Sequence, residues 1–366
     1  MKRTILLIGG TGPMGQYCQE IMDDGNTEII ITSRGKHKSD RKSIRFIQGD
    51  AMDISFLKSV LSLKYYDAIV DFMLYSVSVF EERVDLLLQS TIQYVFLSSA
   101  RIYAGQEYPL TEDSPRLLDY CGDSNYLQTH EYALEKARCE DILKNSGKNN
   151  YTIVRPYITY GVYRLQLGVL EKENWLYRAL HGRSIVFSDD IASKKTTMTF
   201  GKDVATGITS LIGREETYGE AFHITYRNSY SWNDILSAYL RTLKKHGITP
   251  NVVILKKSLS LLYPSNKYQV IYCRYFNRYF DNNKIGQFMD LNQFTDTMDG
   301  LDACLEKFLR NSIFSKIDWI MEAFLDKATK EHTPLNEIDG FPAKIRYLVA
   351  RYTRYYEIRL KMSTTR

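Results

Sequence analysis

The chain has 366 residues, is 44 % hydrophobic and 25 % charged, and carries a formal net charge of +5. This length and apolar content suffice for one large domain, or two modest ones, with a hydrophobic core. The composition therefore excludes a small scaffold that depends on disulfides or metals for its stability.

The cysteines are odd in number and show no paired metal-ligand spacing: Cys18, Cys121, Cys139, Cys273 and Cys304. We therefore expect reduced thiols, a cytoplasmic protein and no metal site. The apolar run near the N-terminus is only about five residues long, shorter than the roughly 7–15 of a signal peptide. No stretch approaches the roughly 20 apolar residues that span a bilayer.

Short apolar runs alternate with helical patterns through the first 160 residues. Strands are predicted at residues 4–8, 28–32, 44–47, 68–72, 94–97 and 151–154, and helices at 12–24, 55–63, 80–89 and 131–144. Runs this short and this apolar are typical of strands buried on both faces. The alternation predicts βαβ units and an α/β fold, a doubly wound parallel sheet with helices on both faces.

The alternation fades after about residue 160. Helices are predicted at 175–180, 203–212 and 232–245, a strand at 221–225, a loop at 193–195 and a helical region at 312–331, with a linker at 334–342. This pattern indicates a smaller, mixed α/β lobe on the C-terminal side of the sheet.

The tail from Phe341 carries seven basic residues against Glu357, a balance of +6, which leaves the rest of the chain near −1. Helical spacing places five apolar residues on one face: Ile345, Leu348, Val349, Tyr352 and Tyr356. A basic amphipathic helix of this kind can lie on an anionic membrane surface. The alternative is a helix packed on its own lobe or on a second subunit, with solvated arginines. A single basic tail is a small footprint for nucleic acid, and no such partner is expected.

A glycine-rich turn, Gly9-Gly10-Thr11-Gly12-Pro13-Met14-Gly15, follows the first predicted strand and opens the first predicted helix. The first glycine permits a tight turn, the second lets the backbone approach a pyrophosphate, and the third allows close helix packing. The helix N-terminus then faces the negative charge. We predict a dinucleotide site formed by Gly9, Thr11, Gly12, Pro13, Met14 and Gly15.

The end of the second strand bears on the choice of cofactor. An acidic residue there binds the ribose of NAD, but this chain has Ser33 and Arg34, which suit the 2′-phosphate of NADP. NADP is slightly favoured over NAD, and a solvated basic turn beside an NAD site is the alternative. After the third strand, Asp50 and Ala51 are predicted to contact the adenine, while Asp53 is also a candidate helix cap.

Tyr132 and Lys136 stand four residues apart on the predicted helix 131–144, so they share one face. A lysine charge there favours the phenolate form, as a proton-transferring tyrosine requires. Such spacing is also common on solvated helix faces, and the chain has 28 tyrosines. Ser98 and Ser99 follow the fifth strand, at the carboxyl edge where open α/β sheets bind ligands. A serine hydroxyl there can hydrogen-bond the same substrate oxygen, and ordinary turn chemistry is the alternative.

These motifs together resemble an extended short-chain dehydrogenase/reductase of the NAD-dependent epimerase/dehydratase family. Over residues 3–300, roughly, the family's Gly-x-x-Gly-x-x-Gly, Ser-Ser-x-x-x-Tyr and Tyr-x-x-x-Lys patterns match residues 9–15, 98–103 and 132–136. Arg155-Pro156 matches the Arg-Pro that ends the sixth strand near the nicotinamide, which adds Pro156 to the cofactor contacts. His223, in a family-like phrase, is interpreted as structural.

The resemblance implies a Rossmann-type domain over residues 1–160, to which later segments return. A substrate-binding lobe covers mainly 161–333, and the basic helical tail covers 341–366. It also implies hydride transfer in which Ser99, Tyr132 and Lys136 are catalytic, with Tyr132 and Lys136 also contacting NAD or NADP. The implied substrate is a nucleotide-linked sugar for polysaccharide synthesis. A homodimer formed through the helices at 80–89 and 131–144 is expected.

Three residues depart from the family patterns. Ala100 and Arg101 stand where many 4,6-dehydratases of the family carry Asp and Glu, which argues against dehydration. Ile158 stands where 4-epimerases place an asparagine that holds the sugar nucleotide. An epimerase and a ketoreductase both stay open, as does a non-catalytic NAD(P)-binding regulator or RNA-binding relative.

Overall fold

In the computed structural model, residues 2–105, 108–262 and 264–363 are described. The chain forms two compact units. The first comprises residues up to 159 together with 197–227 and 280–295, and the second comprises 160–196, 228–279 and 296 onward. Arg366, which counts toward the charge of the tail, lies outside the described residues.

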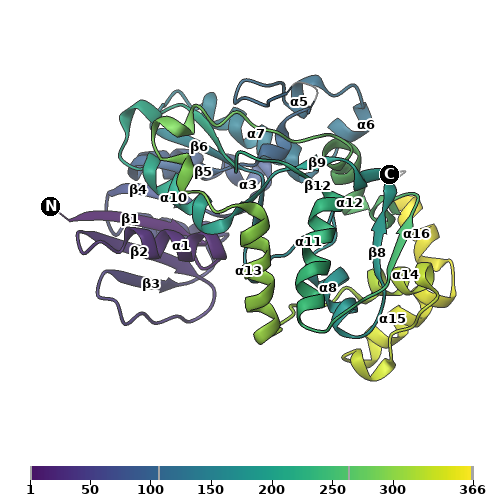
Figure 1. The fold of residues 1–366 in the computed structure, drawn as a ribbon. Coiled ribbons are helices and arrows are strands. Elements are labelled where there is room, and N and C mark those ends of the chain that lie inside the picture. Colours follow the sequence, from purple (N-terminus) through teal and green to yellow (C-terminus); the bar gives the residue numbers. More distant parts are fainter. Residues whose placement is uncertain (1, 106–107, 263, 364–366) are drawn as a thin grey trace. The chain divides into compact units, whose positions relative to one another are not determined.

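A seven-stranded parallel sheet organises the first unit (Figure 1). Its order is β11-β6-β5-β4-β1-β2-β3. The chain adds β2 and β3 on one side of β1 and the later strands, beginning with β4, on the other side. The bounds are β1 Arg3–Ile8, β2 Thr27–Ser33, β3 Ile44–Gln48, β4 Tyr66–Asp71, β5 Thr91–Leu97, β6 Tyr151–Pro156 and β11 Ala221–Ile224. The predicted doubly wound parallel sheet is therefore confirmed.

Helices cover both faces because alternate strand residues point to opposite sides. One face packs Leu6, Ile30, Ile69 and Phe96 against the helices α2, α3, α4 and α7, while α1 and α10 lie against each other in the same unit. The helices of this unit are α1 Pro13–Met22, α2 Ile54–Leu61, α3 Val77–Glu81, α4 Val84–Gln89, α5 Leu117–Tyr120, α6 Ser124–Leu127, α7 Tyr132–Lys144 and α10 Gly201–Leu211. In addition, β7 (Ile158–Tyr160) pairs with β10 (Met198–Phe200).

The single helix predicted at 80–89 is wrong, because the segment forms two short helices, α3 and α4. Arg83 lies between them with non-helical angles (φ −123°, ψ −12°) and is 1 % exposed. Its Nε donates to the Val79 carbonyl at 2.6 Å and its Nη1 to the Ala51 carbonyl at 3.2 Å. These hydrogen bonds hold the guanidinium in the interior, and the helix is interrupted at Arg83.

The second unit is built around helices and two small sheets. Strand β8 (Ile185–Ser188) pairs in parallel with β13 (Val252–Leu255), and β9 (Lys195–Thr196) pairs antiparallel with β12 (Tyr230–Ser231). Its helices are α8 Lys172–Leu180, α9 Asp189–Ala192, α11 Trp232–Lys245, α12 Pro264–Gln269, α13 Thr297–Arg310, α14 Trp319–Thr329, α15 Phe341–Tyr352 and α16 Tyr355–Ser363. None of the helices in the described ranges is long and apolar enough to cross a membrane.

Two predictions for the C-terminal region need correction. The helical region expected at 312–331 begins only at Trp319, where Asp318 caps α14 by accepting from the Ile320 and Met321 amides. The tail forms two helices and not one, because Thr353 is extended (φ −124°, ψ 172°) and its hydroxyl bonds the Val349 carbonyl and the Tyr355 amide. This side chain competes with the helical hydrogen bonds at the break.

A buried charge network holds α14 in the second unit. Arg178 is 0 % exposed, and its Nη1 lies 2.7 Å from both Glu322 and Asp326 while its Nη2 lies 2.6 Å from Glu331. Burial raises the pKa of Glu322 to about 7, with Asp326 adding to the rise and the charges of Arg178 and Arg183 opposing it. Glu322 therefore takes up a proton on folding near neutral pH.

The folded pKa of Glu322 lies above its unfolded value of 4.5, so its contribution to stability is complete below about pH 4.5 and is lost as pH rises through 7. Glu322→Gln should remove this loss. We expect the difference in unfolding free energy between variant and wild type to grow by roughly 2–3 kcal/mol from pH 5 to pH 8. Urea unfolding across this range measures it. The exposed control Glu216→Gln should follow wild type. If the unfolding free energies of Glu322→Gln and wild type change with pH in parallel, the raised pKa of Glu322 is contradicted.

Candidate active site at the carboxyl edge of the parallel sheet

The glycine turn between β1 and α1 has the backbone of a phosphate-binding loop. Gly9 adopts φ +67°, and its amide donates to Thr32 Oγ1 at 3.0 Å. A Cβ on Gly15 would lie 2.3 Å from the Gly10 carbonyl oxygen, so only glycine allows α1 to pack this closely. Gly12, by contrast, has open space where its Cβ would be.

The N-terminus of α1 is open to an anion. Gly12 supplies no side-chain cap, Pro13 occupies the first turn, and no acidic residue lies in that turn. Gly12 and Pro13 are exposed, and Thr11 and Met14 are half-buried. The amides and the helix dipole therefore suit a pyrophosphate, so the predicted loop residues fit a dinucleotide.

A basic loop follows β2. Ser33 is buried and its Oγ accepts from the Gly35 amide at 3.2 Å, whereas Arg34 is exposed. The loop continues with further exposed basic residues, Lys36, His37, Lys38, Arg41 and Lys42. A hollow of about 300 Å³ lies against it, lined by Thr11, Gln16, Gln19, Glu20, His37, Lys38, Ser39, Arg41, Ile44 and Phe46. Sequence reasoning noted the start of this loop but missed the extent of its charge.

The residues after β3 have local structural roles. Asp53 caps α2, with Oδ1 accepting from the Ser55 and Phe56 amides at 2.7 and 3.2 Å, as the alternative interpretation predicted. Asp50 is exposed and accepts from the Met52 amide at 2.9 Å. Ala51 is buried, with its carbonyl bonded to Arg83. The adenine contact predicted for Asp50 and Ala51 stays a prediction.

Tyr132 and Lys136 both lie on α7, at its first and fifth residues. Lys136 is 3 % exposed, and its Nζ donates to the Leu97 carbonyl at 2.5 Å and to the Met73 carbonyl at 3.3 Å. These carbonyls lie at or just past the ends of β5 and β4. Tyr132 is half-buried, and its hydroxyl has no hydrogen-bond partner in the part of the chain that is described.

Ser98 and Ser99 follow Leu97 directly, so the lysine contact brings the serine turn to α7. Ser99 is 4 % exposed, and its Oγ accepts from the Arg101 amide at 3.2 Å, which leaves its hydroxyl proton available to another acceptor. The hydroxyl of Ser98 is buried and unpartnered among the described residues. The three predicted catalytic residues, Ser99, Tyr132 and Lys136, are thus gathered at one edge of the sheet.

Arg101 reaches the same place, which sequence reasoning did not anticipate. Its guanidinium carbon lies 5.1 Å from the centre of the Tyr132 ring, and its Nη2 pairs with Glu131. Glu131 also caps α7, because its Oε2 accepts from the Ala133 amide at 2.7 Å and from the Tyr126 hydroxyl at 3.1 Å. The helix was predicted to begin at Glu131, and an acidic residue at a helix start is a signal that could have indicated the capping role of Glu131.

A buried carboxylate lies beneath the site. Asp71 ends β4 at 0 % exposure and accepts from the Tyr75 and Tyr94 hydroxyls at 2.9 and 2.8 Å and from the Met73 amide at 2.9 Å. Burial raises the pKa of Asp71, while these hydrogen bonds and the charge of Lys136 oppose the rise. Asp71 stands inside the apolar run 68–72, and this position could have indicated a buried carboxylate from the sequence.

Arg155 is a structural residue. It is 2 % exposed and forms a two-point ion pair with Glu140, Nε to Oε1 at 2.9 Å and Nη2 to Oε2 at 2.7 Å. His223 is fully buried, and its Nε2 lies 2.5 Å from the Asp281 carbonyl. Burial lowers the pKa of His223 to about 4, so it is neutral and consistent with a structural role. Pro156 ends β6, buried and paired with Ile224 of β11.

Helix α7 is wrapped by the segment that precedes it. Arg116 pairs with Asp141 at 2.7 Å, and Arg138 donates to the Thr129 carbonyl at 2.9 Å. Only Lys144 among the helix residues is classed as exposed. The expected homodimer through this helix stays a prediction, and much of the outer surface of the helix is already covered by its own chain.

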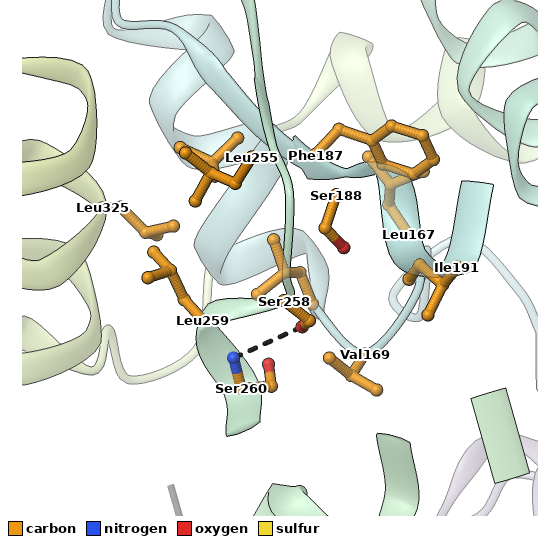
Figure 2. A pocket seen from close by; sticks show the side chains of 12 residues that line it. Leu167, Val169, Phe187, Ser188, Ile191, Leu255, Ser258, Leu259, Ser260 and Leu325 are labelled. Carbon is orange, nitrogen blue, oxygen red and sulfur yellow. Dashed lines mark hydrogen bonds between the residues drawn. The ribbon is translucent and has the colours of Figure 1, made fainter. Parts of the chain in front are cut away.

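The second unit contains a small internal hollow beside β8 and β13 (Figure 2). Its volume of about 20 Å³ has room for one water and not for a sugar nucleotide. Ser258 Oγ accepts from the Ser260 amide at 3.3 Å in its wall. Among the described residues, no group of three or more His, Cys, Asp or Glu side chains could hold a metal ion.

Comparison with known proteins places these features in a family. The profile of the NAD dependent epimerase/dehydratase family matches residues 5–224. A curated relative, chloroplast stem-loop binding protein of 41 kDa b from Arabidopsis thaliana, is 23 % identical over 251 residues. That match covers 65 % of this chain and 62 % of the relative, less than two thirds of its length.

Solved structures share the fold. An epimerase from Methanothermobacter thermautotrophicus has 15 % identity and a TM-score of 0.64, covering 84 % of this chain and 93 % of its own. A dTDP-glucose 4,6-dehydratase from Bacillus anthracis, in complex with NAD, has 17 % identity, a TM-score of 0.64 and coverage of 84 % and 97 %. A UDP-glucuronic acid 4-epimerase from Bacillus cereus, also with NAD, has 15 % identity, a TM-score of 0.63 and coverage of 85 % and 99 %.

Two glycines of the turn should respond differently to alanine. Gly12→Ala meets open space and should change the unfolding free energy by less than about 1 kcal/mol, but its methyl group should weaken nucleotide binding at least about tenfold. Gly15→Ala meets the Gly10 carbonyl and should cost roughly 1–3 kcal/mol of stability. Thermal unfolding and calorimetric titration with NAD(H) and NADP(H) separate the two effects. Equal destabilisation by both variants would contradict this division.

Proposed function

The chain belongs to the NAD-dependent epimerase/dehydratase family, and from this membership we propose that it is an NAD(P)-dependent epimerase or ketoreductase acting on a sugar. The observation that carries the proposal is the contact of Lys136 Nζ with the Leu97 carbonyl, at 2.5 Å. Through it the helix that bears Tyr132 is fixed to the turn that bears Ser99. In the proposed reaction, a proton donor, a hydrogen-bond donor and a cation act on one substrate oxygen.

The chemistry assigned to each side chain follows from its surroundings. Tyr132 gives a proton to a substrate carbonyl oxygen or takes one from a hydroxyl, because its own hydroxyl is uncommitted among the described residues. Ser99 donates a hydrogen bond to the same oxygen. Lys136 stabilises negative charge developing there and binds the cofactor ribose. When bound, the nicotinamide supplies or accepts the hydride.

Arg101 bears on the kind of reaction. A guanidinium 5.1 Å from the Tyr132 ring, anchored by Glu131, adds a second positive charge beside the reacting tyrosine. An arginine cannot serve as the acid or base that water elimination from the sugar requires. Oxidation and reduction of a hydroxyl-bearing carbon, with or without inversion, therefore fits this site better than dehydration.

The proposed substrate is a nucleotide-linked sugar, in keeping with the similar structures that are named as enzymes of dTDP-glucose and UDP-glucuronic acid. From this class we propose a role in polysaccharide synthesis, and from the unpaired cysteines a cytoplasmic location. Ile158 is buried at 4 % exposure where 4-epimerases resembling this chain place an asparagine, so the diphosphate must be held by other groups.

A second candidate function is RNA binding by a protein that keeps the nucleotide site. The curated relative is named as a stem-loop binding protein, and the exposed basic loop after β2 offers phosphate contacts. The Tyr132→Phe experiment below distinguishes RNA binding from catalysis, because RNA binding does not need the Tyr132 hydroxyl.

Tyr132→Phe should lose turnover by about 10²–10⁴-fold and keep cofactor affinity within about twofold. The assay follows cofactor absorbance and product stereochemistry on a panel of UDP- and dTDP-linked hexoses. Tyr163→Phe, at an exposed tyrosine, is the matched control and should behave as wild type. Unchanged turnover in Tyr132→Phe would refute the site. The second candidate would be favoured if wild type turns over none of the panel and if wild type and Tyr132→Phe bind stem-loop RNA equally well.

For the cofactor we propose NADP, because Ser33 replaces the usual acidic residue and Arg34 begins a basic loop beside a 300 Å³ hollow. Arg34→Ala combined with Lys38→Ala should weaken NADPH binding by about 10–100-fold and leave NADH binding within about twofold. Lys148→Ala, an exposed lysine elsewhere in the same unit, is the control. Fluorescence titration measures both affinities. Tighter binding of NADH than NADPH by wild type would overturn this assignment.

A further inference from the structure

Helix α15 has two apolar stripes on opposite faces. One stripe, Ala343, Tyr347 and Ala350, is buried against Ala323 and Phe324 of α14. The other, called here the outer stripe, consists of Phe341, Ile345, Leu348 and Tyr352. At about 100° per residue, the centres of the two stripes lie roughly 160° apart. The predicted face is corrected by this finding, because Val349 is half-buried and Tyr356 packs against the α14 cluster.

The outer stripe is unusually exposed. Phe341 is 74 % and Tyr352 67 % exposed, the two highest values among the large apolar side chains described. In α16, Tyr355 and Ile358 are also exposed, at 53 % and 55 %. Six of the seventeen exposed large apolar side chains of the described chain thus fall between residues 341 and 358. Such a concentration marks an interaction surface.

Positive charge flanks the outer stripe on both sides. Lys344 precedes Ile345 and Arg346 follows it, about 100° away on either side of the helix, and Arg354 lies beyond Tyr352. None of these three side chains pairs with a carboxylate among the described residues. Glu357, the only acid in residues 341–363, forms an ion pair with Lys327 at 2.6 Å. The charge of the tail is therefore available to an external anion.

Arg346 also lines a hollow. It has a volume of about 330 Å³ and is lined by Lys316, Ile317, Asp318, Trp319, Ile320 and Arg346. Two cations, one carboxylate and an indole around one recess give it a mixed polar and apolar character, as at a membrane interface.

We propose that α15 docks this protein on an anionic lipid surface. The outer stripe enters the boundary between headgroups and acyl chains, and Lys344, Arg346 and Arg354 meet the phosphates. Lipid is favoured over a protein partner because one cation stands on each side of a narrow apolar line and a third, Arg354, follows its end. Nucleic acid offers no partner for four aligned apolar side chains that are 36–74 % exposed.

The test is co-sedimentation of the full chain with vesicles of phosphatidylcholine alone or of an equal mixture with phosphatidylglycerol. We expect binding only to the mixed vesicles, and at least about a tenfold loss of that binding when salt rises from low to physiological concentration. The triple variant Phe341→Ser, Leu348→Ser, Tyr352→Ser should lose binding at least about tenfold. These side chains are exposed, so its thermal unfolding should match wild type.

The matched control is Tyr163→Ser with Ile254→Ser, which removes two exposed apolar side chains of the same unit outside the tail. It should bind the mixed vesicles as wild type does. Lys344→Gln with Arg346→Gln should weaken binding to mixed vesicles and leave the fold intact. The proposal is overturned if wild type binds neither vesicle, if the triple variant binds undiminished, or if the triple variant instead only dissociates an oligomer seen by light scattering.

Discussion

The ammonium of Lys136 is nearly excluded from water and is satisfied by two backbone carbonyls, those of Leu97 and Met73. A buried cation without such partners would be strongly unfavourable. Helix α7 can therefore dock in only one register on the ends of β4 and β5. The position of Tyr132, the approach of the Ser99 turn and the pairing of Arg101 with Glu131 all depend on that register, and Asp71 below supplies a compensating carboxylate.

The two units solve the problem of buried charge differently. At the candidate site of the first unit, Lys136 and Asp71 meet backbone atoms or hydroxyls at the ends of strands, while Arg155 and Glu140 form a buried ion pair elsewhere in that unit. In the second, Arg178 gathers three carboxylates at once, and one of them, Glu322, is close to its protonation point at neutral pH. The first arrangement fixes a reactive edge, whereas the second fixes a helix, α14, on which the tail rests.

The sequence predicted the sheet far better than the C-terminal half. Apolar runs and the glycine turn report on local geometry, so β1 to β6 followed from them, and helix 232–245 was predicted with its observed ends. Ser99, Tyr132 and Lys136 were predicted from motif spacing and family resemblance, and their roles stay predictions. The break at Arg83 and the pairing of Arg101 with Glu131 depend on contacts between residues about 30 positions apart. Periodicity carries no information on such contacts. Helix α13, with Gly300 in its interior, was missed because glycine weakens a helical pattern.

The buried stripe of α15 is packed against α14 before the outer stripe meets a partner. Tyr347 is 1 % exposed, and its hydroxyl bonds Asp326 at 2.7 Å, so the helix is anchored to the same carboxylate that holds Arg178. A tail that folds only on binding spends part of its interaction energy on ordering its backbone. Here the ordering is complete beforehand, which favours rapid and reversible association, with the second unit held at a fixed angle to the surface that α15 meets.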